Sequence, residues 1–141
     1  MQQLARRFVR SINARHGRSG TLFEGRFRSG ILQANTHLLP CMWVLDSEPL
    51  RLGLVAQAQD WAYSSAAWYV GSAAAQQGFQ GGQIGSLLTS PPEVWALGNT
   101  PYEREAQYAQ GLQQALRPAW MPALQAGWAV GEADFLAHVQ A

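Results

Sequence analysis

The chain has 141 residues, of which 48% are hydrophobic and only 13% are charged, so it has the size and the apolar content of one folded domain. This composition excludes a chain that is disordered throughout, because such chains combine low hydrophobicity with high charge. We expect neither a membrane span nor a signal peptide, and the single cysteine excludes an internal disulfide framework and a cysteine-rich zinc site. A cytoplasmic location is therefore the default expectation.

Charge is distributed unevenly, although the net charge is only +1. Residues 1–30 contain seven arginines and one acid, a net charge of +6, whereas residues 52–141 have a net charge of −4. Every cation is an arginine, whose planar guanidinium suits bidentate contacts to phosphates and base edges. A GC-rich genome would also explain the missing lysines, but it would not explain the clustering. The asymmetry predicts an anionic partner for the basic end.

The first predicted element is an amphipathic helix over residues 2–15, because Leu4, Phe8 and Ile12 recur at helical spacing. A turn follows at 16–20. Residues 21–32 are extended in character, with a strand expected over 22–32. Phe27 and Ser29 would face one side of this strand, Arg26 and Arg28 the other, and Gly25 and Gly30 indicate bends.

The second predicted helix begins at an N-cap at Asn35 or Thr36 and ends near Ser47. Pro40 is expected near its first turn, where the missing N–H costs little, and Pro49 interrupts the helical pattern. The helix is expected to be well buried through its apolar residues, which are Leu38, Leu39, Met42, Trp43 and Leu45.

The rest of the chain predicts short helices on either side of a linker. Ser64 or Ser65 caps a helix that ends at Val70 and is closed by Gly71, and residues 72–86 are rich in Gly, Ala and Gln. Three helices follow, near 101–116, 119–126 and 132–140, packed together by Trp120, Trp128 and Phe135. The predicted organisation is a core at 1–71, a linker at 72–86 and a helical region at 87–141.

Side-chain chemistry gives little support for catalysis. None of His16, His37 and His138 has a histidine partner at the spacing that offers two metal ligands from one element, and we expect each to be solvated or locally hydrogen-bonded. Cys41 lies in an apolar helix and is expected to be a small buried residue rather than a reactive thiolate. Ser64 and Ser65 lack a neighbouring base and a nucleophile-elbow pattern.

The arginine cluster is the strongest functional signal from composition. Arginines interleaved with Phe8, Phe23 and Phe27 fit phosphate contact combined with base stacking. The alternative is a solvated basic face that packs against acids elsewhere in the protein. The predicted nucleic-acid contacts are Arg6, Arg7, Arg10, Arg15, Arg18, Arg26 and Arg28.

Three segments carry a resemblance to a known family. They are RHGRSGTLFEGRFRSGIL at 15–32, HLLPCMWVLDSEPLRLGLV at 37–55 and DWAYSS at 60–65. Together they resemble the REP-associated tyrosine transposases, single-tyrosine enzymes of the His-hydrophobic-His superfamily. The resemblance implies an α+β, mostly helical fold, a partial ferredoxin-like core followed by a small C-terminal helical region. It also implies a role in DNA transposition on single-stranded hairpin DNA, often as a dimer.

The family's chemistry, as the resemblance implies it, requires residues that this sequence lacks. A tyrosine attacks a DNA phosphate, and two histidines with a polar group hold a divalent metal such as magnesium. Here the chain starts inside the helix that follows the histidine pair, and the tyrosine position falls on Val44. Glu48 falls on a metal-ligand position but is expected to be a solvated acid, and Tyr63 and Tyr69 are expected to be packing groups. We therefore expect no catalytic residues, no metal site and no cofactor in this chain.

Three functional hypotheses follow. The first is a transposase-like DNA-binding protein that is catalytically inactive in this truncated form. The second is a decayed remnant whose unpaired strand edges predict poor solubility or dimers that complete each other's sheets. The third is an interaction module that docks on an intact transposase as a heterodimer.

Overall fold

The computed structural model describes residues 1–25, 28–72, 88–115, 118–126 and 128–140. The described part is mostly helical, with one small sheet of two strands. Its helices are α1 (Gln2–His16), α2 (Ala34–Arg51), α3 (Ala66–Tyr69), α5 (Pro92–Trp95), α6 (Pro101–Gln114), α7 (Met121–Ala126) and α8 (Ala133–Gln140), with a 3-10 turn η1 at Ala58–Asp60. The strands are β1 (Ile31–Leu32) and β2 (Ala129–Val130). The predicted linker at 72–86 lies outside the described residues except for Ser72.

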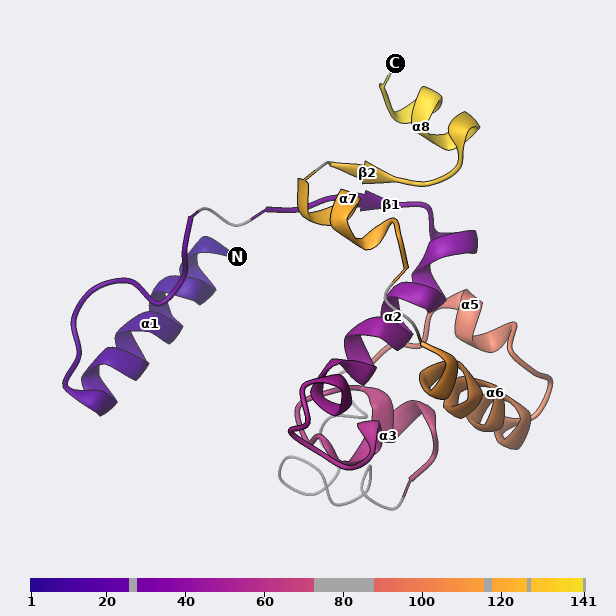
Figure 1. Ribbon diagram of the computed structural model, residues 1–141, viewed down its shortest axis with the longest axis horizontal. Coiled ribbons are helices and arrows are strands. Elements are labelled where there is room, and N and C mark those ends of the chain that lie inside the picture. Colours follow the sequence, from indigo (N-terminus) through magenta and orange to yellow (C-terminus); the bar gives the residue numbers. More distant parts are fainter. Residues whose placement is uncertain (26–27, 73–87, 116–117, 127, 141) are drawn as a thin grey trace.

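α1 confirms the first predicted helix to within one residue at its end. It ends at His16 and is capped by Gly17, whose backbone is left-handed with φ of 59°, a conformation that glycine adopts without steric cost. Figure 1 shows α1 standing to one side of the other helices, joined to them by the chain that leads into β1.

The strand expected over 22–32 is reduced to two residues. Residues 21–25 bend instead, and Gly25 is left-handed with φ of 76°. Ile31 and Leu32 pair in parallel with Ala129 and Val130. A strand forms only where a neighbour accepts and donates its ladder hydrogen bonds, and β2 offers just two residues for this pairing.

α2 is longer than predicted and begins earlier. It starts directly after β1, at Ala34 rather than after Asn35 or Thr36, and its N-cap residue is Gln33, whose N–H still donates to the carbonyl of Val130 at 2.9 Å. It continues past Ser47 to Arg51. Both prolines lie within it, Pro40 beyond the first turn and Pro49 in the last turn, where no long helical segment depends on its missing N–H.

The core lies where α2, α3, α5 and α6 meet, in the lower part of Figure 1. Its buried residues are Ala58, Ala66, Tyr69, Val94, Tyr108 and Leu112. Trp43 of α2 packs closely against α6 because residue 111 is a glycine, and a Cβ there would overlap the indole. α5 and α6 therefore share one core with α2 and α3.

The prediction of which α2 residues are buried was partly wrong. Leu38, Leu39, Met42 and Trp43 are half-buried, whereas Leu45 is 58% exposed. The carboxylate of Asp46 takes the inward position, and Leu45, one residue and about 100° round the helix, is left at the edge.

The elements after residue 88 match the predicted helices in α6, α7 and α8, while α5 and β2 were not predicted. Ser65 is the N-cap residue of α3, as expected, and Gly71 beyond it is left-handed with φ of 63°. The expected packing among the terminal aromatic residues was partly wrong. The ring centroids of Trp120 and His37 of α2 are 5.2 Å apart, so Trp120 packs against α2. Trp128 is half exposed. No described helix has the length and apolar content needed to cross a bilayer.

Candidate nucleic-acid interface

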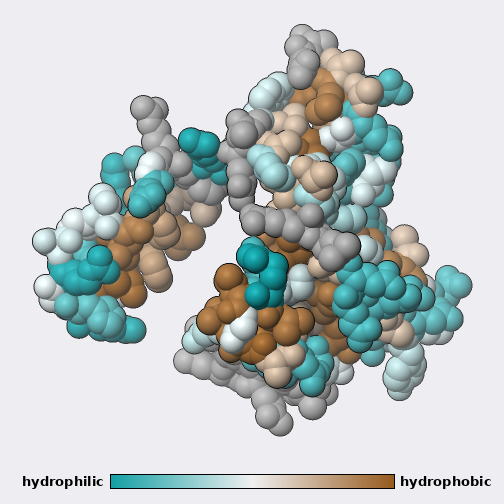
Figure 2. Space-filling model, viewed as in Figure 1, coloured by the Kyte–Doolittle hydropathy of each residue, from teal (hydrophilic) through white to brown (hydrophobic). Residues whose placement is uncertain are grey.

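α1 is an amphipathic helix in which Arg6 and Arg10 lie on the face opposite the apolar line, Arg7 lies beside that line and Arg15 extends it. Arg6, Arg7 and Arg10 are spaced so that they neighbour one another on successive turns, and Arg6 and Arg10 face away from Leu4 and Phe8. Figure 2 shows hydrophilic residues on the outer side of α1 and hydrophobic residues on the side that faces the rest of the molecule.

The segment after α1 folds back on the helix and keeps its C-terminal arginines near it. The Arg18 N–H donates to the Asn13 carbonyl at 2.9 Å, and the Asn13 side-chain amide donates to the Gly20 carbonyl at 2.9 Å. Arg15 and Arg18 thus flank the end of α1, where cations are favoured by the helix dipole. Five arginines therefore lie on α1 and the turn that follows it, residues 2–20, which we call the α1 hairpin.

These five arginines are exposed and have no ion-pair partner among the described residues. The α1 helix itself contains no acid. Like charges on neighbouring turns repel, so this arrangement favours an external anion close to the helix. The lack of a described ion-pair partner also argues against the predicted alternative, a basic face neutralised by acids elsewhere in the chain.

Two arginines outside the cluster behave differently. Arg51 forms an ion pair with Glu48 on the same helix, and Arg104 lies 4.5 Å from the centre of the Trp95 ring while donating to the Gly98 carbonyl. Both guanidinium groups thus have contacts with other residues of the chain. The contrast separates arginines that stabilise the fold from arginines that have no described internal partner.

The structure brings together most, not all, of the predicted contact residues. Arg6, Arg7, Arg10, Arg15 and Arg18 share the α1 hairpin, and Arg28 is exposed on the segment that leads to β1. Arg26 and Phe27 lie outside the described residues. Phe8 and Phe23 contact each other with ring centroids 6.2 Å apart, and each remains about half exposed. Half-exposed aromatic faces beside cations are suited to stacking with bases.

The sequence analysis missed the most buried polar network in the described protein. The Asp46 carboxylate is 5% exposed, and it accepts hydrogen bonds from the Tyr108 hydroxyl at 2.9 Å, the Ser65 hydroxyl at 3.0 Å and the Ser65 N–H at 3.2 Å. Burial raises the pKa of Asp46, while these three donors act in the opposite direction. The network joins α2, α3 and α6.

This network is suited to holding the fold rather than to catalysis. Burial, and then the charge of Asp46, raises the pKa of Tyr108, which is fully buried and stays protonated as a donor. Tyr69 is also buried, with its ring 4.8 Å from that of Tyr108. The sequence signal for the network is a carboxylate inside an otherwise apolar helical face, with serines and tyrosines elsewhere in the chain as donors.

The positions that the family resemblance singles out have ordinary structural roles here. Val44 is buried in α2, and Glu48 pairs with Arg51. Tyr63 is 72% exposed and contacts Trp61 with ring centroids 5.7 Å apart, so the expectation of a packing group fits Tyr69 better. Burial raises the pKa of the half-buried Cys41 thiol, which disfavours its reactive thiolate. Within the described ranges, no three His, Cys, Asp or Glu side chains gather as a metal site would require.

Comparison with protein families, with curated proteins and with solved structures gives no match to this chain: no family model, no curated relative and no structural neighbour.

Proposed function

We propose that this chain is a transposase-like DNA-binding protein that holds single-stranded or hairpin DNA through α1 and does not itself cut or join it. The observation that carries the proposal is the set of five exposed arginines on the α1 hairpin, which have no ion-pair partner among the described residues. Guanidinium groups in this arrangement neutralise several phosphates of one strand at once.

The proposal includes a relationship to the REP-associated tyrosine transposases, with residues 1–71 as a partial ferredoxin-like core and a cytoplasmic site of action. Support comes from the motifs at 15–32, 37–55 and 60–65 and from the order of α1, β1 and α2, a helix, a strand and a helix. The absence of catalysis rests on Val44, since a valine side chain cannot attack a phosphate.

Fluorescence anisotropy across a salt series tests the proposal. The probes are a labelled hairpin, a duplex of equal length and an unstructured strand. Tight binding to the hairpin with a steep loss of affinity at high salt is expected, because each phosphate contact contributes a slope of roughly −0.7 on single strands in a plot of log affinity against log salt. A flat salt response would contradict phosphate contact by the cluster.

Charge-removing variants locate the interface. Replacing Arg6, Arg7 and Arg10 together with glutamine should reduce the salt slope by about 2, since three phosphate contacts are lost. A single Arg10→Gln is compared with Arg51→Gln, which removes the same charge from an arginine already paired with Glu48. Equal losses for the two single variants would show that net charge rather than the α1 hairpin governs binding.

A second candidate function is self-association through the other face of α1. Leu4 is 63% exposed and Phe8, although it contacts Phe23, is 51% exposed, which leaves an apolar stripe only partly covered in the described structure. The partner that we infer is a second copy of this chain. Residues 1–30 are strongly basic and the remainder of the chain is acidic, so the basic end of one copy is attracted to the acidic part of the other and brings the stripe into contact with it. Light scattering after gel filtration should then give a dimer mass that Phe8→Ser reduces to a monomer, whereas a monomer at high protein concentration excludes this function.

A further inference from the structure

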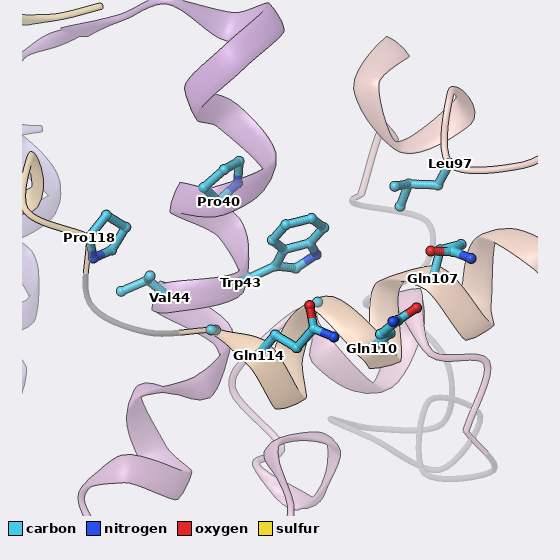
Figure 3. A pocket seen from close by; sticks show the side chains of 10 residues that line it. Pro40, Trp43, Val44, Leu97, Gln107, Gln110, Gln114 and Pro118 are labelled. Carbon is cyan, nitrogen blue, oxygen red and sulfur yellow. The ribbon is translucent and has the colours of Figure 1, made fainter.

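A hollow of about 450 Å³ lies between α2 and α6, away from the α1 hairpin. Figure 3 shows how it is built: Pro40 and Trp43 project from α2, Gln107, Gln110 and Gln114 project from α6, and Pro118 lies at the far side. Its volume falls within the range of small-molecule sites, but it is open to solvent, because the three glutamines that line it are exposed.

The walls of this hollow are apolar and its polar groups are neutral. Among the described residues that line it, none is charged, so a phosphate or a metal ion would find no compensating group there. The three glutamine amides form no hydrogen bond with other described residues, so their donors and acceptors are available to a ligand. The chemistry fits an uncharged, flat group with a polar edge.

The three amides come from one face of α6 because they are spaced by three and four residues. Gly111 lies on the same face and allows the Trp43 indole to approach α6, which fixes one wall of the hollow. The indole Nε1–H is buried and has no hydrogen-bond partner among the described residues. This nitrogen lies against Gly111, so the edge of the indole that carries it faces α6 rather than the open hollow.

We propose that this hollow receives one unstacked nucleobase of a DNA strand held by α1. An aromatic ring and prolines offer flat surfaces to the base, and glutamine amides are able to donate to and accept from its edge. The inference rests on the proposed function, because the phosphates of that strand are assigned to the arginines.

The test compares base-bearing and abasic strands against paired variants of the full chain. The triple variant Gln107→Ala, Gln110→Ala, Gln114→Ala removes the amides, and Gln113→Ala is the control, because Gln113 is exposed on the same helix but does not line the hollow. Binding is measured by anisotropy with an unstructured strand and with the same strand made abasic at a single position, scanned along its length.

The expected result is a loss of about tenfold in affinity of the triple variant for the base-bearing strand. At one position the abasic strand should already show this loss, and there the triple variant should add nothing further. The salt slope should be unchanged, and Gln113→Ala should bind like the parent protein. Circular dichroism of each variant confirms that it is folded, and a strand carrying photoreactive 5-iodouracil should cross-link within α2 or α6.

Other outcomes separate the two proposals. Normal affinity of a folded triple variant, or cross-links confined to α1, overturns the base pocket and leaves DNA binding through α1 intact. Failure of the parent protein to bind any strand overturns both. Binding of free deoxynucleosides as tightly as the strand overturns the inference that the base belongs to a strand held by α1.

Discussion

Loss of the Tyr108 hydroxyl should destabilise the protein through Asp46. Tyr108 has no exposed surface and its hydroxyl lies 2.9 Å from an Asp46 carboxylate oxygen, so water cannot replace the hydroxyl. Tyr108→Phe keeps the ring contacts with Trp43 and Tyr69 and leaves no cavity of consequence. Loss of a hydrogen bond to a charged group should lower the free energy of unfolding by about 2 kcal/mol near neutral pH.

The effect should depend on pH with a definite sign. Burial raises the pKa of Asp46 in the folded protein above its ordinary value of 3.8. Asp46 therefore contributes stability that is fully present below that ordinary value and is lost as pH rises through the folded-state pKa. Because the Tyr108 hydroxyl lowers this pKa, Tyr108→Phe should raise it further. The cost of the substitution should be smaller at about pH 4 than at about pH 7.5.

Urea denaturation followed by tryptophan fluorescence at the two pH values measures both effects. Tyr102→Phe is the control, because Tyr102 lies on the same helix and is 83% exposed. Asp46→Asn should abolish the difference between the pH values that Tyr108→Phe produces. A Tyr108→Phe variant as stable as the control at both pH values would refute the role assigned to the network.

Three further predictions concern single features of the chain. Gly111→Ala should reduce stability by about 1–3 kcal/mol in thermal or urea denaturation, because the added methyl group overlaps the Trp43 indole, and a Trp43→Phe background should relieve part of this cost. Thr100→Ala should cost about 1 kcal/mol in the same assays, since Thr100 and Glu103 form a reciprocal capping box at the start of α6; no loss of helicity or stability would contradict that role. Incubation of the purified chain with magnesium and hairpin DNA should give no covalent adduct on a denaturing gel, and a shifted band would overturn the assignment of Val44 to the nucleophile position.

The elements that were predicted well have signals that are local in the sequence. α1 follows from the helical recurrence of Leu4, Phe8 and Ile12, and its end follows from Gly17. α6 begins at Pro101, a residue suited to the first position of a helix. The arginine cluster was also visible without a structure, because its members are close together in the chain and remain so on one hairpin.

Other features depended on residues far apart in the chain. The strand expected over 22–32 was limited to Ile31 and Leu32 by the short β2, nearly a hundred residues later. The buried network around Asp46 was not predicted, because its donor Tyr108 lies 62 residues away in the sequence. Likewise, the row of glutamines on α6 became the wall of a hollow only because Trp43 of α2 packs against Gly111.

The sequence by itself therefore determined the amphipathic basic helix, its apolar stripe and the positions of most later helices. Only the tertiary structure decided which side of α2 is buried, that a carboxylate rather than Leu45 points inward, and that the α1 arginines lack an internal partner in the described protein. The physical reason is that helix formation depends on neighbours within a few residues, whereas burial of a charge depends on donors that distant segments supply.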